Sequence, residues 1–135
     1  MQEDVYRLCD RIRQTAYDVH AFLAHGHLEK VYENALVHRL RKQGLNVRQQ
    51  HGIRVLDEDG TPIGDYAADL FVEDQIIVEL KTARTLAPEH EAQLIGYLKS
   101  SRIEHGLLIN FGSYKFEIRK FALSRTRSPI PESPP

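Results

Sequence analysis

Apolar side chains recur every three or four positions in two stretches near the N-terminus, as they do along the buried side of a helix. Residues 4–23 carry the first of these stripes, and the spacing predicts a helix there. Residues 28–43 carry the second, and its apolar side contains Val31, Ala35, Leu36 and Leu40. Gly26 lies in the break between the two helices, and Gly44 provides a cap after the second one.

After Gly44 the apolar spacing changes to two, which is typical of strands. An acidic, glycine-ended turn at residues 57–60 joins the first two of these strands into a hairpin. Pro88 favours the start of a third helix, over about residues 88–100. Residues 114–123 also alternate, and the pattern leaves open whether they form a strand or a short helix. Strands are predicted over residues 45–55, 63–72, 76–80 and 106–111.

The resulting order α-α-β-β-β-α-β predicts an α/β (α+β) fold with a mixed sheet flanked by helices. The chain has 135 residues, which favours a single domain, and we assign that domain to residues 1–123. Residues 124–135 contain four prolines and are predicted to form a disordered tail.

Composition and charge exclude several classes of protein. Hydrophobic residues make up 41% of the chain and charged residues 27%, values that exclude wholesale disorder. The 18 basic and 19 acidic residues leave a net charge of -1, which disfavours a strongly basic nucleic-acid wrapper. The one cysteine, Cys9, excludes an internal disulfide. No apolar run reaches membrane-spanning length and the N-terminus is acidic, so we expect a cytoplasmic protein with no membrane partner.

Glu79 and Lys81 interrupt the most hydrophobic strand of the sequence, residues 76–80 and the lysine that follows. Because the two residues are two positions apart on a strand, their side chains leave from the same face. Burying a carboxylate or an ammonium group costs several kcal/mol unless the group is paired, hydrated or bound to a metal. The pattern therefore indicates a chemical role for this strand.

The length of the turn before this strand decides what lies opposite Glu79. A three-residue turn at residues 73–75 places Asp69 directly opposite Glu79, whereas a two-residue turn places Asp69 opposite Val78, on the other face. In the first register the Cβ atoms of the two acids stand about 4.5–5.5 Å apart. One divalent cation with oxygen ligands, Mg²⁺ or Mn²⁺, would then relieve the repulsion between the carboxylates.

These residues together suit the hydrolysis of a phosphate ester. Asp69 and Glu79 would hold the ion, and the backbone carbonyl of Leu80 would be a further ligand. Lys81 would orient or deprotonate the attacking water, or stabilise the charge that develops on the phosphate. The simpler structural interpretation is a hairpin with one cross-strand salt bridge at its solvent-exposed end.

Asp69 followed by Glu79-x-Lys81 resembles the signature of the PD-(D/E)xK nuclease superfamily. Gly26-x-x-Glu29-x-x-Tyr32 resembles the motif that names the GxxExxY family, a branch of that superfamily. The sequence departs from the pattern at one named position, where alanine stands in place of proline before Asp69.

A second resemblance concerns the third predicted helix. Gln93-x-x-x-Tyr97 resembles the helix motif that follows the lysine in RecB-type nucleases. These likenesses imply a restriction-endonuclease-like core in which Glu29 assists the metal and Gln93 and Tyr97 lie near the substrate. The cysteines that hold an iron–sulfur cluster in some RecB-like relatives are absent, so no cluster is expected.

Glu29 and Tyr32 are three positions apart on a helix and therefore share a face. The functional interpretation is a metal-facing acid and a supporting hydroxyl close to the substrate. The structural interpretation is an acid that favours the positive end of the helix dipole beside a half-buried tyrosine.

The sequence thus predicts a Mg²⁺- or Mn²⁺-dependent nuclease, with DNA favoured over RNA as the substrate. The alternative is a non-catalytic nucleic-acid-binding or assembly module that retains the nuclease fold. Because the chain has only modest basic clusters, we also expect that a homodimer or a partner protein helps it to hold nucleic acid.

Overall fold

The computed structural model describes residues 3–123, and these form three helices and a five-stranded sheet. The predicted fold class is confirmed, and the segment left open between strand and helix forms a fifth strand. The predicted tail, 124–135, lies outside the described residues. None of the helices formed by residues 3–123 has the length and apolarity that a transmembrane span needs. The elements are α1 (Val5–Leu23), α2 (Glu29–Lys42), β1 (Val47–Leu56), β2 (Pro62–Val72), β3 (Ile76–Lys81), α3 (Pro88–Ser101), β4 (His105–Asn110) and β5 (Glu117–Ala122).

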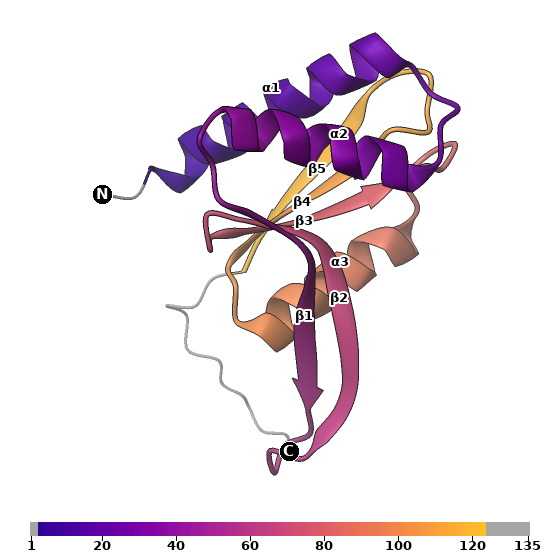
Figure 1. Cartoon of the computed structure of the whole chain (residues 1–135). Coiled ribbons are helices and arrows are strands. Elements are labelled where there is room, and N and C mark those ends of the chain that lie inside the picture. Colours follow the sequence, from indigo (N-terminus) through magenta and orange to yellow (C-terminus); the bar gives the residue numbers. More distant parts are fainter. Residues whose placement is uncertain (1–2, 124–135) are drawn as a thin grey trace.

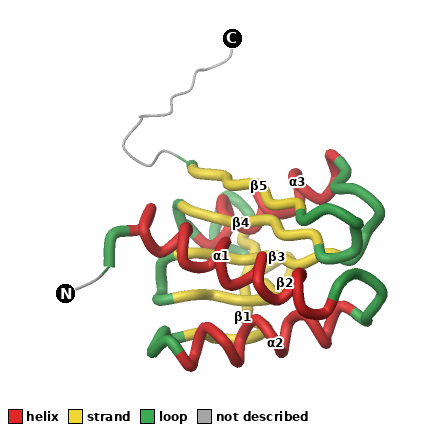
Figure 2. Tube along the Cα trace, turned by 90° about the horizontal axis from the view of Figure 1, so that it is seen from above, coloured by secondary structure: helices red, strands yellow, loops and turns green. Residues whose placement is uncertain are grey.

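The five strands lie side by side in the order β1-β2-β3-β4-β5. Neighbouring strands are antiparallel except β3 and β4, which are parallel because α3 crosses between them and returns the chain to the same end of the sheet. Helices α1 and α2 cover one face of the sheet and α3 covers the other (Figures 1 and 2). Strand β3 is therefore buried between two layers, which explains its almost continuous apolar sequence.

Two apolar clusters hold the helices against the sheet. The larger cluster lies under α1 and α2, and its fully buried members include Leu8, Ile12, Leu36, Leu40 and Leu80. The smaller cluster lies under α3, where Leu94 and Leu98 pack with residues of β3 and β4. The residues that α1 contributes to the larger cluster, and most of those that α2 contributes, are the ones that the helical spacing predicts to be buried.

The prediction for the buried side of α2 is wrong at one position. Val31 is 40% exposed, whereas Glu33 is 2% exposed and lies beneath the helix. A buried carboxylate needs hydrogen-bond donors, and Glu33 receives them from Lys30 and from the side chains of Gln49 and Gln50. The contacts with Gln49 and Gln50 of β1 are tertiary, and helical spacing within α2 does not predict them.

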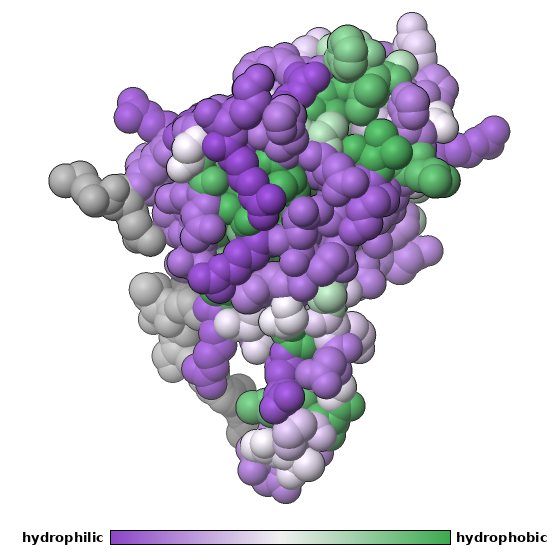
Figure 3. Space-filling model, viewed as in Figure 1, coloured by the Kyte–Doolittle hydropathy of each residue, from purple (hydrophilic) through white to green (hydrophobic). Residues whose placement is uncertain are grey.

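Strands β1 and β2 continue beyond the rest of the sheet as a two-stranded arm, residues 52–67, which projects from the body (Figure 1). Three apolar side chains of this arm are more than half exposed: Leu56, Ile63 and Tyr66. In the space-filling view the arm forms a separate lobe below the body, and hydrophobic residues are visible on it (Figure 3).

Where the arm leaves the body, the buried side chains of β1 and β2 change from the face covered by α1 and α2 to the face covered by α3. In β1, Val47 packs in the cluster under α1 and α2, whereas Ile53 packs in the cluster under α3. In β2, Leu70 packs in the cluster under α1 and α2, whereas Ala68 packs in the cluster under α3. Gln50 lies at this switch with φ of 52°, in the left-handed region, and it interrupts the regular alternation of β1.

Candidate active site

Asp69 and Glu79 face each other across the hairpin of β2 and β3. The hairpin pairs Leu70 with Val78, and continuing this register places Asp69 opposite Glu79. Residues 73–75 form the turn. The structure thus has the three-residue turn, the alternative that brings the two acids onto one face.

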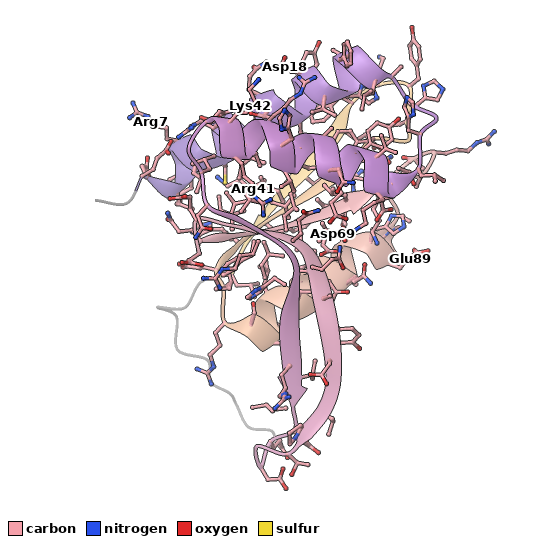
Figure 4. The ribbon with its side chains drawn as sticks, viewed as in Figure 1. Arg7, Asp18, Arg41, Lys42, Asp69 and Glu89 are labelled. Atoms are coloured by element: carbon pink, nitrogen blue, oxygen red, sulfur yellow. The ribbon has the colours of Figure 1, made fainter. Side chains whose placement is uncertain are left out.

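Backbone groups hold both carboxylates in place. Glu79 Oε2 accepts a hydrogen bond from the N–H of Asp69 at 2.8 Å, and Asp69 Oδ2 accepts one from the N–H of Leu80 at 2.7 Å. The side chain of Glu79 is buried and that of Asp69 is half-buried. The two carboxylates therefore converge at the edge of the core, beneath α2 and at the base of the arm, where Figure 4 shows Asp69.

Burial disfavours the charged forms of both acids. Burial raises the pKa of Glu79 to about 8, and the nearby charge of Asp69 contributes to that increase. The pKa of Asp69 is also raised, mainly by burial, although the hydrogen bond from the backbone of Leu80 opposes this effect. A bound cation would favour the charged forms again, which is the condition expected at a metal site.

Lys81 follows Glu79 on β3, with its side chain on the same face. Its Nζ donates a hydrogen bond to Oε1 of Gln93 at 2.9 Å. Gln93 lies in the first half of α3, so the helix motif that begins at Gln93 contacts the lysine of β3 directly. This contact orients the ammonium group beside the carboxylates.

Tyr97, the other end of that motif, is 7% exposed and its ring lies against that of Tyr66, with the ring centroids 5.4 Å apart. Burial raises the pKa of its hydroxyl, and the charges of Glu79 and Asp69 raise it further. The phenol therefore lies within electrostatic reach of the carboxylates and forms part of the wall between the site and the arm.

Glu29 and Tyr32 have different surroundings, although they share a helix face. Glu29 is half-buried in the first turn of α2, and its pKa is raised by burial and by the charge of Asp69. Tyr32 is fully buried: its hydroxyl donates to the carbonyl of Ala24 at 2.5 Å and its ring stacks on Phe111. The structure thus places Tyr32 in the core, where it holds the turn before α2 and offers no surface to a substrate.

Sequence reasoning missed two residues of the site, Glu33 and Gln50. Nε2 of Gln50 lies 3.3 Å from Oδ1 of Asp69 and 3.2 Å from Oε1 of Glu33, so this amide links the buried acid of α2 to the site. The only signal in the sequence was the polar pair Gln49-Gln50 within an alternating strand.

The donor set at the site fits a divalent ion that keeps water ligands. Within residues 3–123, no three His, Cys, Asp or Glu side chains form a group that could hold a metal ion, so Glu29 does not form such a group with Asp69 and Glu79. Asp69 and Glu79 supply two converging carboxylates. Mg²⁺ retains several waters and is usually bound through one or two carboxylates, which matches this arrangement.

Comparison with known proteins agrees with this architecture. The fold is similar to the crystal structure of a protein named SSO0001, with a TM-score of 0.57 and 20% sequence identity over 70% of this chain and 50% of that one. The chain therefore spans about half the length of that protein. A search of curated protein sequences finds no match. The model of the PD-(D/E)XK nuclease superfamily matches residues 6–121, which include the whole candidate site. The chain belongs to the PD-(D/E)XK nuclease superfamily.

Proposed function

We propose that this protein is a metal-dependent nuclease that hydrolyses phosphodiester bonds of DNA. The observation that carries the proposal is the convergence of two poorly solvated carboxylates, Asp69 and Glu79, with the ammonium group of Lys81 on the same face of β3. The pKa of Glu79 is raised, mainly by burial, so the protein environment disfavours the charged form of this acid. A cation-binding role explains an arrangement that stability alone does not.

Each residue has a distinct role in this proposal. Asp69 and Glu79, with the carbonyl of Leu80, hold Mg²⁺ or Mn²⁺, and Glu29 adds negative charge from α2. The bound ion would polarise a phosphodiester oxygen and lower the pKa of a bound water. Lys81 orients or deprotonates the attacking water, or stabilises the charge that develops on the phosphate.

Within the superfamily, we assign the chain to the GxxExxY, RecB-like branch, and three observations support this assignment. The hydroxyl of Tyr32 accepts a hydrogen bond from the N–H of His27 at 3.2 Å and donates to Ala24, so the motif tyrosine closes the turn before α2. Gly26 adopts φ of 118°, which favours glycine. The contact between Gln93 and Lys81 gives the helix motif a role in orienting the lysine.

The test of the nuclease function is cleavage of plasmid and linear DNA by the purified full chain. We expect cleavage with Mg²⁺ or Mn²⁺, no cleavage with EDTA, and folded but inactive Asp69→Asn protein. Asp65→Asn is the matched control, because Asp65 lies on the exposed arm and pairs with Arg54. Equal activity of the wild-type and Asp69→Asn proteins would assign the cleavage to a contaminant or to another site.

A second candidate function is a non-catalytic nucleic-acid-binding or assembly module that retains the fold. The observation in its favour is that only two acidic side chains converge within the described residues, while Lys81 is already engaged by Gln93. Calorimetry with Mn²⁺ separates the two functions. Saturable binding that Glu79→Gln abolishes supports the nuclease, and the absence of such binding supports the module.

A further inference from the structure

Two pockets that share Ser100 lie between α3 and the arm, and together they form a cleft along this helix. Its first part has a volume of about 370 Å³ and is lined by Val55, Tyr66, Ala92, Gln93, Gly96, Tyr97 and Ser100. Its second part, about 440 Å³, shares Ser100 with the first and continues to Lys99 and Arg102 opposite the tip of the arm. Because Gln93 also contacts Lys81, the cleft opens directly beside the site.

The wall of the first part offers an aromatic surface. Tyr66 of the arm is 53% exposed although its ring lies against Tyr97, so part of the ring remains open to a ligand. Nucleobases stack on tyrosine rings with little dependence on sequence. The bases of a duplex are already stacked on one another, so only a single strand or a frayed end can use such a ring.

Gly96 keeps the middle of the cleft wide. A Cβ at this position would meet no atom within 4 Å, so the space beside the helix is open. Glycine inside a helix lowers helix stability relative to alanine. A larger side chain at position 96 would therefore fill the cleft while favouring the helix.

The far part of the cleft carries positive charge on its helix side. Within residues 3–123, Lys99 and Arg102 form no ion pair. Asp57 and Glu58 line the arm side, so phosphate groups would lie against the helix. At 1.5 Å per residue, Arg102 lies about 13 Å along the helix axis from Gln93, roughly the length of four stacked nucleotides.

We propose that this cleft binds one strand of nucleic acid, with a base stacked on Tyr66 and phosphate groups at Lys99 and Arg102, and leads that strand to the carboxylates. The proposal rests on the nuclease function proposed above, and it specifies the substrate as single-stranded or frayed DNA. The ligand class follows from the combination of an open aromatic ring, a cleft between α3 and the arm, and basic side chains, Lys99 and Arg102, that form no ion pair within residues 3–123.

The experiment measures the fluorescence anisotropy of labelled oligothymidylate, and of a duplex of equal length, with the full chain in EDTA. We expect the single strand to bind more tightly than the duplex. Tyr66→Ala should weaken single-strand binding about tenfold, equivalent to about 1.4 kcal/mol. Tyr114→Ala is the matched control, because Tyr114 is 83% exposed and lies outside the cleft.

Two further variants keep the test independent of Tyr66. Gly96→Leu should leave the melting temperature unchanged or higher and lower single-strand affinity by about tenfold or more. The double variant Lys99→Glu/Arg102→Glu should reduce both the affinity and its salt dependence, whereas Lys42→Glu on α2 should have little effect on either.

Equal affinity for the single strand and the duplex, or cleft variants that bind like their controls, would overturn the cleft proposal. Because binding is measured in EDTA, its outcome does not depend on catalysis. A chain that binds through the cleft but does not cleave DNA contradicts only the nuclease function. A chain that cleaves DNA while its cleft variants bind and cleave like the wild type contradicts only the cleft proposal.

Discussion

Asp69 and Glu79 each accept a hydrogen bond from the strand that carries the other acid. The N–H of Asp69 donates to Glu79, and the N–H of Leu80, next to Glu79, donates to Asp69. These bonds hold the carboxylates in one orientation, but they do not compensate for burial, since both pKa values remain raised. The hairpin therefore preorganises two acids whose charged forms a bound cation would stabilise.

Lys81 is predicted to affect catalysis without affecting metal binding. Lys81→Met should lower the cleavage rate by about 10²–10⁴-fold, because the variant loses a group that handles a proton or developing charge. Its Mn²⁺ affinity should stay within a few-fold of wild type, since the lysine is not a ligand. Cleavage kinetics measure the rate and calorimetry measures the Mn²⁺ affinity, with Lys42→Met on α2 as the control. An unchanged cleavage rate in Lys81→Met would show that Lys81 has no part in the mechanism.

Glu79 is predicted to make the metal-free protein less stable as the pH rises. Its pKa is about 8 in the folded state and near 4.5 in the unfolded chain, so between these values the folded state binds the extra proton. The free energy of unfolding should fall over this range by on the order of a few kcal/mol and then level off. Glu79→Gln should flatten most of this slope. Urea unfolding in EDTA at several pH values is the measurement, and a wild-type stability that rises from pH 5 to 8 would contradict it.

Divalent ions are predicted to stabilise the protein more at pH 8 than at pH 6. At the lower pH a proton on Glu79 competes with the metal, because the ligand must be deprotonated. Mn²⁺ should raise the melting temperature of the wild-type protein at pH 8 and have little effect on Glu79→Gln. Stabilisation of both proteins to the same extent would place the ion elsewhere.

Gln50 is predicted to position Asp69 through its link to Glu33. Gln50→Leu should weaken Mn²⁺ binding by about 10–100-fold, as loss of an outer hydrogen-bond partner does at other metal sites. Gln49→Leu is the matched control, because Gln49 donates to Glu33 at 2.8 Å but has no hydrogen bond to Asp69 among the described residues. Both variants should lose about 1–3 kcal/mol of stability, and only Gln50→Leu should lose metal affinity. Equal metal affinity in the two variants would show that the link does not position the site.

Gly112 is predicted to tolerate no side chain. A Cβ there would lie 2.3 Å from the carbonyl carbon of Thr82 and 2.6 Å from the nitrogen of Ala83, in the segment that follows Lys81. Gly112→Ala should therefore destabilise the protein by about 3 kcal/mol or more, because the obstruction is backbone. Gly52→Ala, where a Cβ meets nothing within 4 Å, should change stability by less than about 1 kcal/mol. Denaturant unfolding compares the two.

Local patterns in the sequence determined most of the fold. The helical stripe of α1, the alternation of β2 and the apolar run of β3 follow from which sides of each element are buried, and that information lies within a few residues. The register that brings Asp69 to Glu79 depends on loop length, and the local pattern left a two-residue and a three-residue turn open; the structure has the three-residue turn at residues 73–75. The alternation of side chains along a strand placed Lys81 on the same face as Glu79, because the two residues are two positions apart.

Only the tertiary structure decided which more distant residues join the site. The burial of Tyr32 and Glu33 goes with contacts to other elements, the ring of Phe111 for Tyr32 and the side chains of Gln49 and Gln50 for Glu33, and helical spacing carries no information about such contacts. Gln50, which has a left-handed backbone conformation, contacts Asp69 of β2, and Tyr66 contacts Tyr97 of α3. Such contacts join elements that are far apart along the chain, so the pattern within any one element cannot determine them.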